Sequence, residues 1–276
     1  MTEGHIVVGV DGSNDARRAT TWALSWAKAA GIPVSLIVAE PIPPGRTPDS
    51  PGLGEKAQAT LDEEIAHFAG AADGVEVSGE VAISHPVTAL VNASQSAGAV
   101  VVGTHGKGGW KGTLVGSVSG NVAAASHSPT VVLPTGAPGT YDPEGAIVVG
   151  YDGSEAASEA AALAIEAAAA EGRVVRLAQA DTGVSSPDEP LENQVAELRE
   201  ANPGVEIELI SERTQAVELL TDLSRDAAFV VVASAGHGGV PGFLLGSTTR
   251  ALVQSAQCPV LVLTRRSEKL WPLATS

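Results

Sequence analysis

Gly103-Thr104-His105-Gly106 follows the β-branched run Val100-Val101-Val102, and Gly116-Ser117 comes after a spacer of nine residues. A β-branched run is typical of a buried strand. A glycine-rich segment between a strand and a helix is where folded chains hold phosphate, because main-chain N–H groups point at the anion. The dipole of the helix also favours negative charge at its beginning. The stretch therefore predicts a strand, a phosphate-binding loop and a helix.

The second half of the chain carries the same unit again. Ala233-Ser234-Ala235-Gly236 follows Val230-Val231-Val232, and Gly246-Ser247 comes after an equal spacer. The segments that end the two units also match, Ser128-Pro129-Thr130-Val131-Val132-Leu133 in one and Cys258-Pro259-Val260-Leu261-Val262-Leu263 in the other. One unit is thus written twice, and the second copy has lost the first of its three spaced glycines.

The segments before the loops repeat as well. Each half opens on an apolar strand with the same ending, Val8-Gly9-Val10-Asp11-Gly12-Ser13 in the first and Val149-Gly150-Tyr151-Asp152-Gly153-Ser154 in the second. Serine at the end of each stretch is a natural N-cap for the helix that follows. In the first half the pattern predicts helices at 15–30, 54–72, 87–96 and 114–126, and later strands at 34–39, 75–83, 100–102 and 130–133. In the second half it predicts helices at 155–170, 191–201, 216–226 and 244–255, and later strands at 174–180, 205–211, 230–232 and 260–264.

Five strands therefore alternate with helices in each half. Right-handed crossovers then require a parallel sheet with helices on both faces, so the fold class is α/β, two tandem open five-stranded units. We expect domains at residues 1–137 and 146–268, a linker rich in Pro and Gly at 138–145, and a tail at 269–276. Strand order does not follow from the pattern. Ligands are expected at the carboxyl ends of strands, where the direction of winding reverses.

The charge balance excludes two classes of partner. The chain has 16 basic and 32 acidic residues and a formal net charge of −16. Nonspecific nucleic-acid binding needs cationic side chains that neutralise phosphates, and docking on an anionic membrane needs basic clusters. We therefore expect no nucleic-acid partner and no membrane partner. A nucleotide is not excluded, because main-chain N–H groups hold phosphate without net positive charge.

The first residues of the chain and its single cysteine indicate in which cell compartment the protein is expected. Residues 1–5 lead straight into a strand, with neither the basic nor the apolar region of a signal peptide. No apolar run approaches the ~20 residues that span a bilayer. Cys258 is the single cysteine, so it forms no intrachain disulfide, and we expect a packed thiol. These features favour a cytoplasmic protein.

The first loop contains further glycines, and two established phosphate motifs do not fit it. Gly108 and Gly109 add to the glycines already named, and Ser117 adds a hydroxyl donor at the beginning of the helix. The chain has no Gly-x-x-x-x-Gly-Lys-Ser/Thr stretch, which excludes a P-loop. The dinucleotide pattern would need a glycine at Lys111. The alternative for the loop is a flexible segment without a ligand.

Two polar residues near the loop have competing interpretations. Asp11 ends the first strand, where its carboxylate could accept a hydrogen bond from a ribose hydroxyl or a base, or could instead cap its own Asp-Gly-Ser turn. His105 is expected to be a loop residue rather than a base, because no carboxylate stands at a spacing that would orient it. We see no nucleophile–histidine arrangement and no cluster of metal ligands. No catalytic residue and no metal ligand is therefore assigned.

These motifs together resemble the universal stress protein family in its tandem two-domain form, and the resemblance covers nearly the whole chain. It rests on Val8-Gly9-Val10-Asp11-Gly12-Ser13, on Gly103-x2-Gly106-x9-Gly116-Ser117, and on the ending at Pro134. The resemblance implies a fold like that of the adenine-nucleotide α hydrolases, with five parallel strands. It also implies that members with the complete glycine motif bind ATP. A bound triphosphate usually brings Mg²⁺ with it.

The family pattern carries over residue by residue. In the first half the resemblance implies an ATP site near the ribose and base, the phosphates and the helix start, formed by Gly9, Asp11, Val38, Gly103, Thr104, His105, Gly106, Lys107, Gly108, Gly109, Gly116, Ser117 and Val118. In the second half the matching residues are Gly150, Asp152, Gly236, Gly246 and Ser247. Ala233 and Gln179 depart from the pattern, so the second site is expected to be weakened, with an empty site as the alternative.

The resemblance also implies how the halves associate. Family members pair through their fifth strands, and here 130–133 and 260–264 could pair within one chain as a pseudo-dimer, which would cover two sheet edges. A homodimer is the further form of association that the family suggests. The protein partner of such a regulator is not identified by the sequence.

Three functions remain open at this stage. The first is an ATP-binding regulatory protein of the stress response with little or no turnover, which fits the absence of a placed general base. The second is an enzyme on the same fold, a slow ATPase or a nucleotidyl transferase, with Lys107, His105 and Lys111 as the candidate residues in the loop. The third is an interaction module without a ligand.

Overall fold

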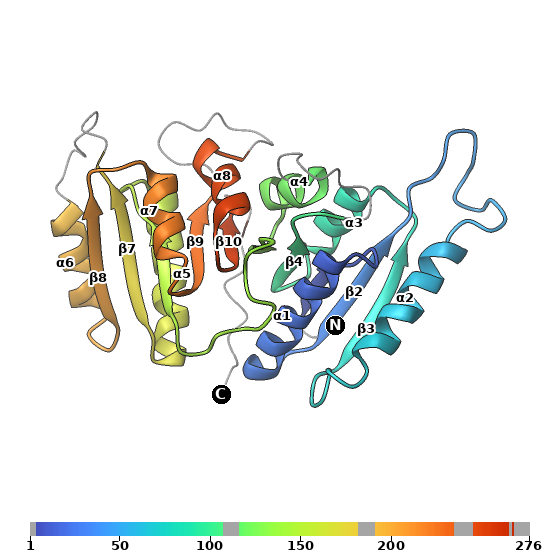
Figure 1. Cartoon of the computed structure of the whole chain (residues 1–276), viewed down its shortest axis with the longest axis horizontal. Helices are drawn as coiled ribbons and strands as arrows, with labels where there is room; N and C mark the ends of the chain where they lie inside the picture. The colour runs from blue at the N-terminus through green and yellow to red at the C-terminus, as the bar shows by residue number, and fades with distance from the viewer. Residues whose placement is uncertain (1–3, 107–115, 182–190, 235–244, 265–266, 268–276) are drawn as a thin grey trace.

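The computed structural model describes residues 4–106, 116–181, 191–234, 245–264 and 267. Two halves with the same order of elements lie side by side along the long axis of the molecule (Figure 1). The first half contains β1 (Ile6–Gly9), α1 (Asn14–Ala30), β2 (Val34–Ala39), α2 (Glu55–Phe68), β3 (Val77–Ala82), α3 (Pro86–Ala93), β4 (Ala99–Gly103), α4 (Ser117–Ala125) and β5 (Thr130–Leu133). The second contains β6 (Ala146–Gly150), α5 (Glu155–Glu171), β7 (Val174–Ala180), α6 (Leu191–Ala201), β8 (Glu206–Glu212), α7 (Ala216–Leu223), β9 (Ala227–Ala233), α8 (Ser247–Ser255) and β10 (Val260–Leu263).

Helix α1 and its counterpart α5 show why the repeated local sequence gives repeated structure. The hydroxyl of Ser13 accepts a hydrogen bond from the N–H of Ala16 at 3.2 Å, and Ser154 does the same for Ala157 at 3.2 Å. Each helix ends at a glycine in the left-handed region, at Gly31 with φ 67° and at its counterpart with φ 69°. Left-handed backbone carries little cost for glycine. Both helices therefore begin and end within one residue of the predicted bounds.

The ten strands found among the described residues belong to one sheet, in the order β3-β2-β1-β4-β5-β10-β9-β6-β7-β8. Neighbours are parallel except at the centre, where β5 and β10 are antiparallel and Val131 is paired with Leu261. The two expected five-stranded parallel units and their pairing through the fifth strands are confirmed. The strand order, which the pattern left open, makes the two halves a continuous sheet.

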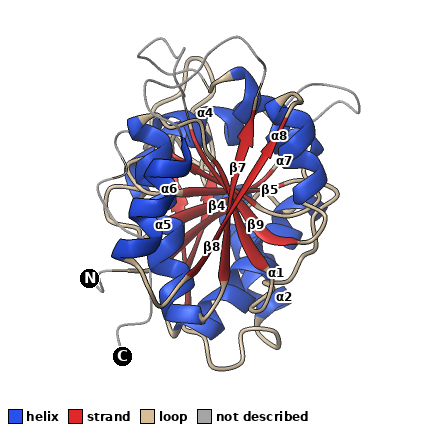
Figure 2. Ribbon diagram, turned by 90° about the vertical axis from the view of Figure 1, so that its left-hand side faces the viewer, coloured by secondary structure: helices blue, strands red, loops and turns tan. Residues whose placement is uncertain are grey.

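Helices cover both faces of this twisted sheet (Figure 2). Side chains of α1, α2, α5 and α6 form one buried apolar cluster, and those of α3, α4, α7 and α8 form the other. Neighbouring residues of β1 divide between the two faces, Val8 into the first cluster and Val7 into the second. Cys258 is buried in the second cluster, and this burial raises the pKa of its thiol to about 12. The packed thiol expected from the sequence is therefore confirmed.

The segment between the halves is fixed to both of them by Tyr141. Its N–H donates to Ser25 Oγ of α1 at 2.7 Å, and its ring centre lies 5.8 Å from that of Trp22. The guanidinium carbon of Arg173 lies 4.9 Å above the Tyr141 ring from the other half. Trp22 and Trp26 are fully buried, and their ring centres lie 5.2 Å apart.

No helix among the described residues combines the length and the apolar character that crossing a bilayer requires.

Candidate functional site

The candidate site lies at the carboxyl edge of the sheet, where β1 and β4 are neighbours. The winding of the first half runs outward from this pair in both directions, to β2 and β3 on one side and to β5 on the other. Asp11 follows β1, and Thr104, His105 and Gly106 follow β4. A β-carbon placed on Gly106 would lie 2.5 Å from Asp11 Oδ2. The structure thus brings the Asp11 turn and the beginning of the glycine loop together at the reversal point.

The described glycines of the loop lie so close to other atoms of the protein that a β-carbon would collide with them. A β-carbon on Gly103 would lie 2.7 Å from the carbonyl carbon and oxygen of Asp15, and one on Gly116 would overlap the carbonyl oxygen of Thr104. None of Gly103, Gly106 and Gly116 has a positive φ. Lack of space for a β-carbon, and not left-handed backbone, therefore accounts for glycine at these three positions.

The first main-chain N–H groups of α4 receive no cap from a side chain, because the N-cap residue is a glycine. Gly116 is the N-cap, and no side-chain hydrogen bond caps this helix. The Gly116 N–H itself donates to the carbonyl oxygen of Thr104 at 3.1 Å, which joins the helix to the end of β4. The N–H groups of Ser117 and Val118 fall in the first turn, where a helix has no acceptor of its own. An anion could accept hydrogen bonds from them.

Asp11 performs the turn role that the sequence allowed. The N–H of Ser13 donates to Asp11 Oδ1 at 3.0 Å. The other carboxylate oxygen, Oδ2, is the atom nearest to Gly106. One carboxylate therefore closes the turn after β1 and at the same time faces the loop after β4.

Gly9 and Val38 lie on the two strands beside the site. A β-carbon on Gly9 would lie 2.8 Å from a methyl group of Leu90, so packing under α3 already requires a small residue there. Val38 is buried near the carboxyl end of β2. The N–H of Val10 donates to the carbonyl oxygen of Ile37, which aligns the ends of β1 and β2. Val38 and Gly9 thus share the edge of the sheet with Asp11.

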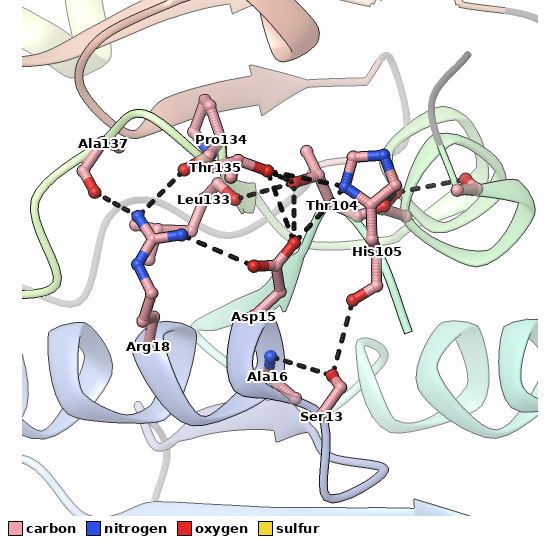
Figure 3. Close-up of polar contacts among 12 residues, drawn as sticks. Ser13, Asp15, Ala16, Arg18, Thr104, His105, Leu133, Pro134, Thr135 and Ala137 are labelled. Atoms are coloured by element: carbon pink, nitrogen blue, oxygen red, sulfur yellow. Dashed lines mark hydrogen bonds and ion pairs between the residues drawn. The ribbon is translucent and has the colours of Figure 1, made fainter. Parts of the chain in front are cut away.

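Asp15 forms a polar cluster with residues at the ends of β4 and β5 (Figure 3). Its Oδ2 lies 3.3 Å from His105 Nδ1, 3.4 Å from Thr104 Oγ1 and 3.5 Å from Thr135 Oγ1. Its Oδ1 lies 3.6 Å from Arg18 Nη1. The expectation that no carboxylate orients His105 is wrong, because Asp15 approaches it from a segment 90 residues away. No spacing rule could have found this pair.

The remaining residues of the cluster hold the ends of β4 and β5 together. Arg18 donates to the carbonyl oxygens of Pro134, at 3.2 Å, and of Ala137. The hydroxyl of Ser13 donates to the carbonyl oxygen of His105 at 3.4 Å. The first turn of α1 therefore contacts both the main chain and the side chains of the segment that begins the loop.

The second half keeps part of this arrangement. Asp152 accepts a hydrogen bond from the N–H of Ser154 at 3.0 Å, as Asp11 does in its own turn. Gly246 is the N-cap of α8, again without a side-chain cap, and its N–H donates to the carbonyl oxygen of Ser234 at 2.8 Å. Ser247 is the first residue of α8, and Gly150 ends β6. Lys107, Gly108, Gly109, Lys111 and Gly236 lie outside the described residues.

Within the described part of the chain, no three side chains of His, Cys, Asp or Glu gather as a metal site would require. The polar groups gathered at the candidate site are main-chain amides, hydroxyls, the carboxylates of Asp11 and Asp15, and the imidazole of His105. Such donors and acceptors can bind a phosphorylated ligand that carries hydroxyl groups.

Comparison with known proteins gives a consistent match over both halves. The model of the universal stress protein family matches residues 3–134 and again residues 145–264. Universal stress protein Rv1996 of Mycobacterium tuberculosis is 30% identical over 299 residues, which cover 93% of this chain and 94% of that protein. Universal stress protein Rv2623 of the same organism is 30% identical over 282 residues, covering 93% and 95%. A crystal structure of a universal stress protein from Archaeoglobus fulgidus DSM 4304 matches with a TM-score of 0.73 at 19% identity, over 96% of this chain and 100% of that one.

Proposed function

This chain belongs to the universal stress protein family, and on that premise we propose that its first half binds ATP. In this proposal the chain acts as a nucleotide-dependent regulator in the stress response, with little or no turnover. ATP occupancy would set the conformation of the loop after β4 and, through it, the choice of a protein partner.

One observation carries the proposal. At the reversal between β1 and β4, a β-carbon on Gly106 would lie 2.5 Å from the Asp11 carboxylate, and the N-cap of α4 is a glycine without a side-chain cap. Helix amides and a carboxylate beside the same loop suit a ligand with both phosphates and hydroxyls.

The residues present fit the parts of ATP. The amides of the loop that begins at Gly103, with those of Ser117 and Val118, would hold the phosphates, because main-chain N–H groups in a glycine loop and at a helix beginning bind anions. Asp11 would accept hydrogen bonds from the ribose, and the main chain of Val38 would contact the adenine. Mg²⁺ bound with the triphosphate would take most of its oxygen ligands from the phosphates, in line with the lack of an acidic cluster among the described residues.

The second half is proposed to bind nucleotide more weakly. Asp152 and the start of α8 at Gly246 retain the arrangement of the first half. Ala233 stands where the first half has Gly103, and in the first half a β-carbon at that place would meet the main chain of Asp15. The edge strands β5 and β10 cover each other within the chain, so a homodimer would need a different surface.

A slow ATPase is the second candidate, and the Asp15–His105 contact favours it. A carboxylate 3.3 Å from Nδ1 orients an imidazole as a general base requires. Against efficient turnover, Arg18 is already engaged by Asp15 and two main-chain carbonyls, so it does not serve as a clamp on phosphate. Release of inorganic phosphate from ATP by the purified chain measures this activity directly.

The test of the main proposal is to denature the purified protein and identify the released small molecules by mass and ultraviolet absorbance. We expect ATP. ADP together with measurable phosphate release would favour the slow ATPase. If no nucleotide is released and calorimetric titration with ATP also gives no heat of binding, the chain is an interaction module without a ligand.

A further inference from the structure

We propose that Asp15 is a positioning residue that holds the beginning of the first glycine loop ready for phosphate and makes the first nucleotide site the stronger of the two. This inference rests on the proposed ATP binding and adds a residue outside the glycine motif. It concerns the ligand's phosphates and not its adenosine part, since the Asp15 cluster lies at the segment that begins the loop.

Asp15 contacts the first three residues of the loop, Gly103, Thr104 and His105. Its carboxylate lies within 3.4 Å of polar side-chain atoms of both Thr104 and His105. Its main chain lies directly against Gly103, where a β-carbon would come within 2.7 Å of the Asp15 carbonyl group. The Asp15 side chain is only 16% exposed, whereas that of His105 is 40% exposed. A largely buried carboxylate thus anchors a more exposed segment.

The segment is held from the strand β5 side as well. Thr135 Oγ1 lies 3.5 Å from both Asp15 Oδ2 and His105 Nδ1, and Thr104 Oγ1 lies 3.3 Å from the carbonyl oxygen of Leu133. Figure 3 shows the side chains of Thr104, His105 and Thr135 converging on the Asp15 carboxylate from the segments that follow β4 and β5. Because several donors share one acceptor, its removal loosens all of them together. A preformed loop has less conformational freedom to lose when it binds phosphate.

The second half lacks this anchor. Its sequence has alanine where the first half has Asp15 and His105, at Ala156 and Ala235. Arg18 and Thr135 also change in character, to Glu159 and Arg265, whereas Ser234 stands in place of Thr104 and Ser154 in place of Ser13. The carboxylate and the groups that surround it have been replaced together. The two halves therefore differ in how their loops are held, in addition to the loss of one glycine at Ala233.

A competing explanation is that Asp15 only stabilises its helix, because a carboxylate in the first turn interacts favourably with the helix dipole, by about 0.3–1 kcal/mol. The chain contains a matched control for this effect. Glu155 is the acidic residue in the first turn of α5, the counterpart of α1, and its side chain is exposed. Glu155→Ala removes a first-turn carboxylate without disturbing a loop anchor.

The experiment compares Asp15→Ala, which installs the residue of the second half, with Glu155→Ala and the unchanged chain. Calorimetric titration gives the affinity of each for ATP and for adenosine, and thermal unfolding gives its stability. We expect Asp15→Ala to weaken ATP binding about tenfold or more, which corresponds to about 1.4 kcal/mol. Adenosine binding should change less than twofold, and Glu155→Ala should leave both affinities unchanged.

Thr135→Val is the second variant, because it removes one of the hydroxyls near Asp15 without changing charge. Alone it should weaken ATP binding modestly, and added to Asp15→Ala it should have no further effect, since residues of one network are not additive. Equal losses of ATP and adenosine binding in Asp15→Ala, unchanged ATP binding, or additive effects of the two variants would each overturn the inference. If the unchanged chain itself binds no ATP, the proposed function fails, which is a result distinct from all of these.

Discussion

The hydroxyl of Tyr141 lies 2.8 and 2.7 Å from the two carboxylate oxygens of Glu171, which joins the segment between the halves to the end of α5. Arg173 donates to the same hydroxyl at 2.5 Å, and its own guanidinium is paired with Glu171 at 2.6 Å. Because Tyr141 also packs on Trp22 of α1, this group connects the two halves on the face of the sheet that α1 and α5 cover. The contact between the halves is therefore larger than the pairing of β5 with β10.

Tyr141→Phe should lower the free energy of unfolding by about 2 kcal/mol, because a buried hydrogen bond to a charged group is worth roughly 1.5–3 kcal/mol. Tyr151→Phe is the matched control, since the Tyr151 hydroxyl contacts a neutral partner, Gln194 Oε1, at 2.9 Å. The control should cost about 1 kcal/mol. Urea denaturation of the two variants measures both losses. A loss for Tyr141→Phe no larger than for the control would contradict a joining role for Tyr141.

High pH should weaken the same group. Burial, with the neighbouring Glu171 carboxylate second, raises the pKa of Tyr141 far above its ordinary value of about 10. The folded state then holds the phenolic proton where the unfolded state releases it, so this contribution to stability is complete below about pH 10 and is lost as the pH rises further. Thermal unfolding from about pH 9 upward should show a steeper decline in the unchanged chain than in Tyr141→Phe. Parallel declines would show that Tyr141 does not titrate in this way.

The repeat in the sequence predicts most of the fold, because each copy carries the same caps, strands and loop. Strand order could not be predicted, since the alternation of strands and helices is the same for any order of parallel strands. The candidate site was found from Asp11 and the glycines, which follow strands directly. The contact between Asp15 and His105 was missed because only the folding of α1 against β4 brings them together. The signal that could have found them is their joint replacement by alanine in the second copy.

Gly103→Ala should weaken both the fold and ATP binding. The added β-carbon would meet the main chain of Asp15 at 2.7 Å, so α1 or the end of β4 must move. Overpacking of this kind costs about 1–3 kcal/mol, and the displaced loop should bind ATP at least tenfold less tightly. Gly70→Ala is the control, because no atom lies within 4 Å of a β-carbon at that position. Thermal unfolding measures the loss of stability, and calorimetric titration measures the loss of ATP affinity. If Gly103→Ala is as stable as Gly70→Ala, the added β-carbon is accommodated without loss of stability, which would contradict the prediction.

Asp11→Ala and Asp152→Ala separate the turn role of this aspartate from its proposed role in binding. Both carboxylates accept a hydrogen bond of 3.0 Å from the N–H of a serine two residues later, so both variants lose the same turn contact. Each should lower stability by about 1 kcal/mol. Only Asp11 stands beside a loop with all three spaced glycines, so Asp11→Ala should reduce the affinity of the tighter ATP site by about tenfold, whereas Asp152→Ala should leave the affinity of that site unchanged. Calorimetric titration measures the affinity of the two variants for ATP. Equal affinities would show that Asp11 only forms its turn and that another group contacts the ribose.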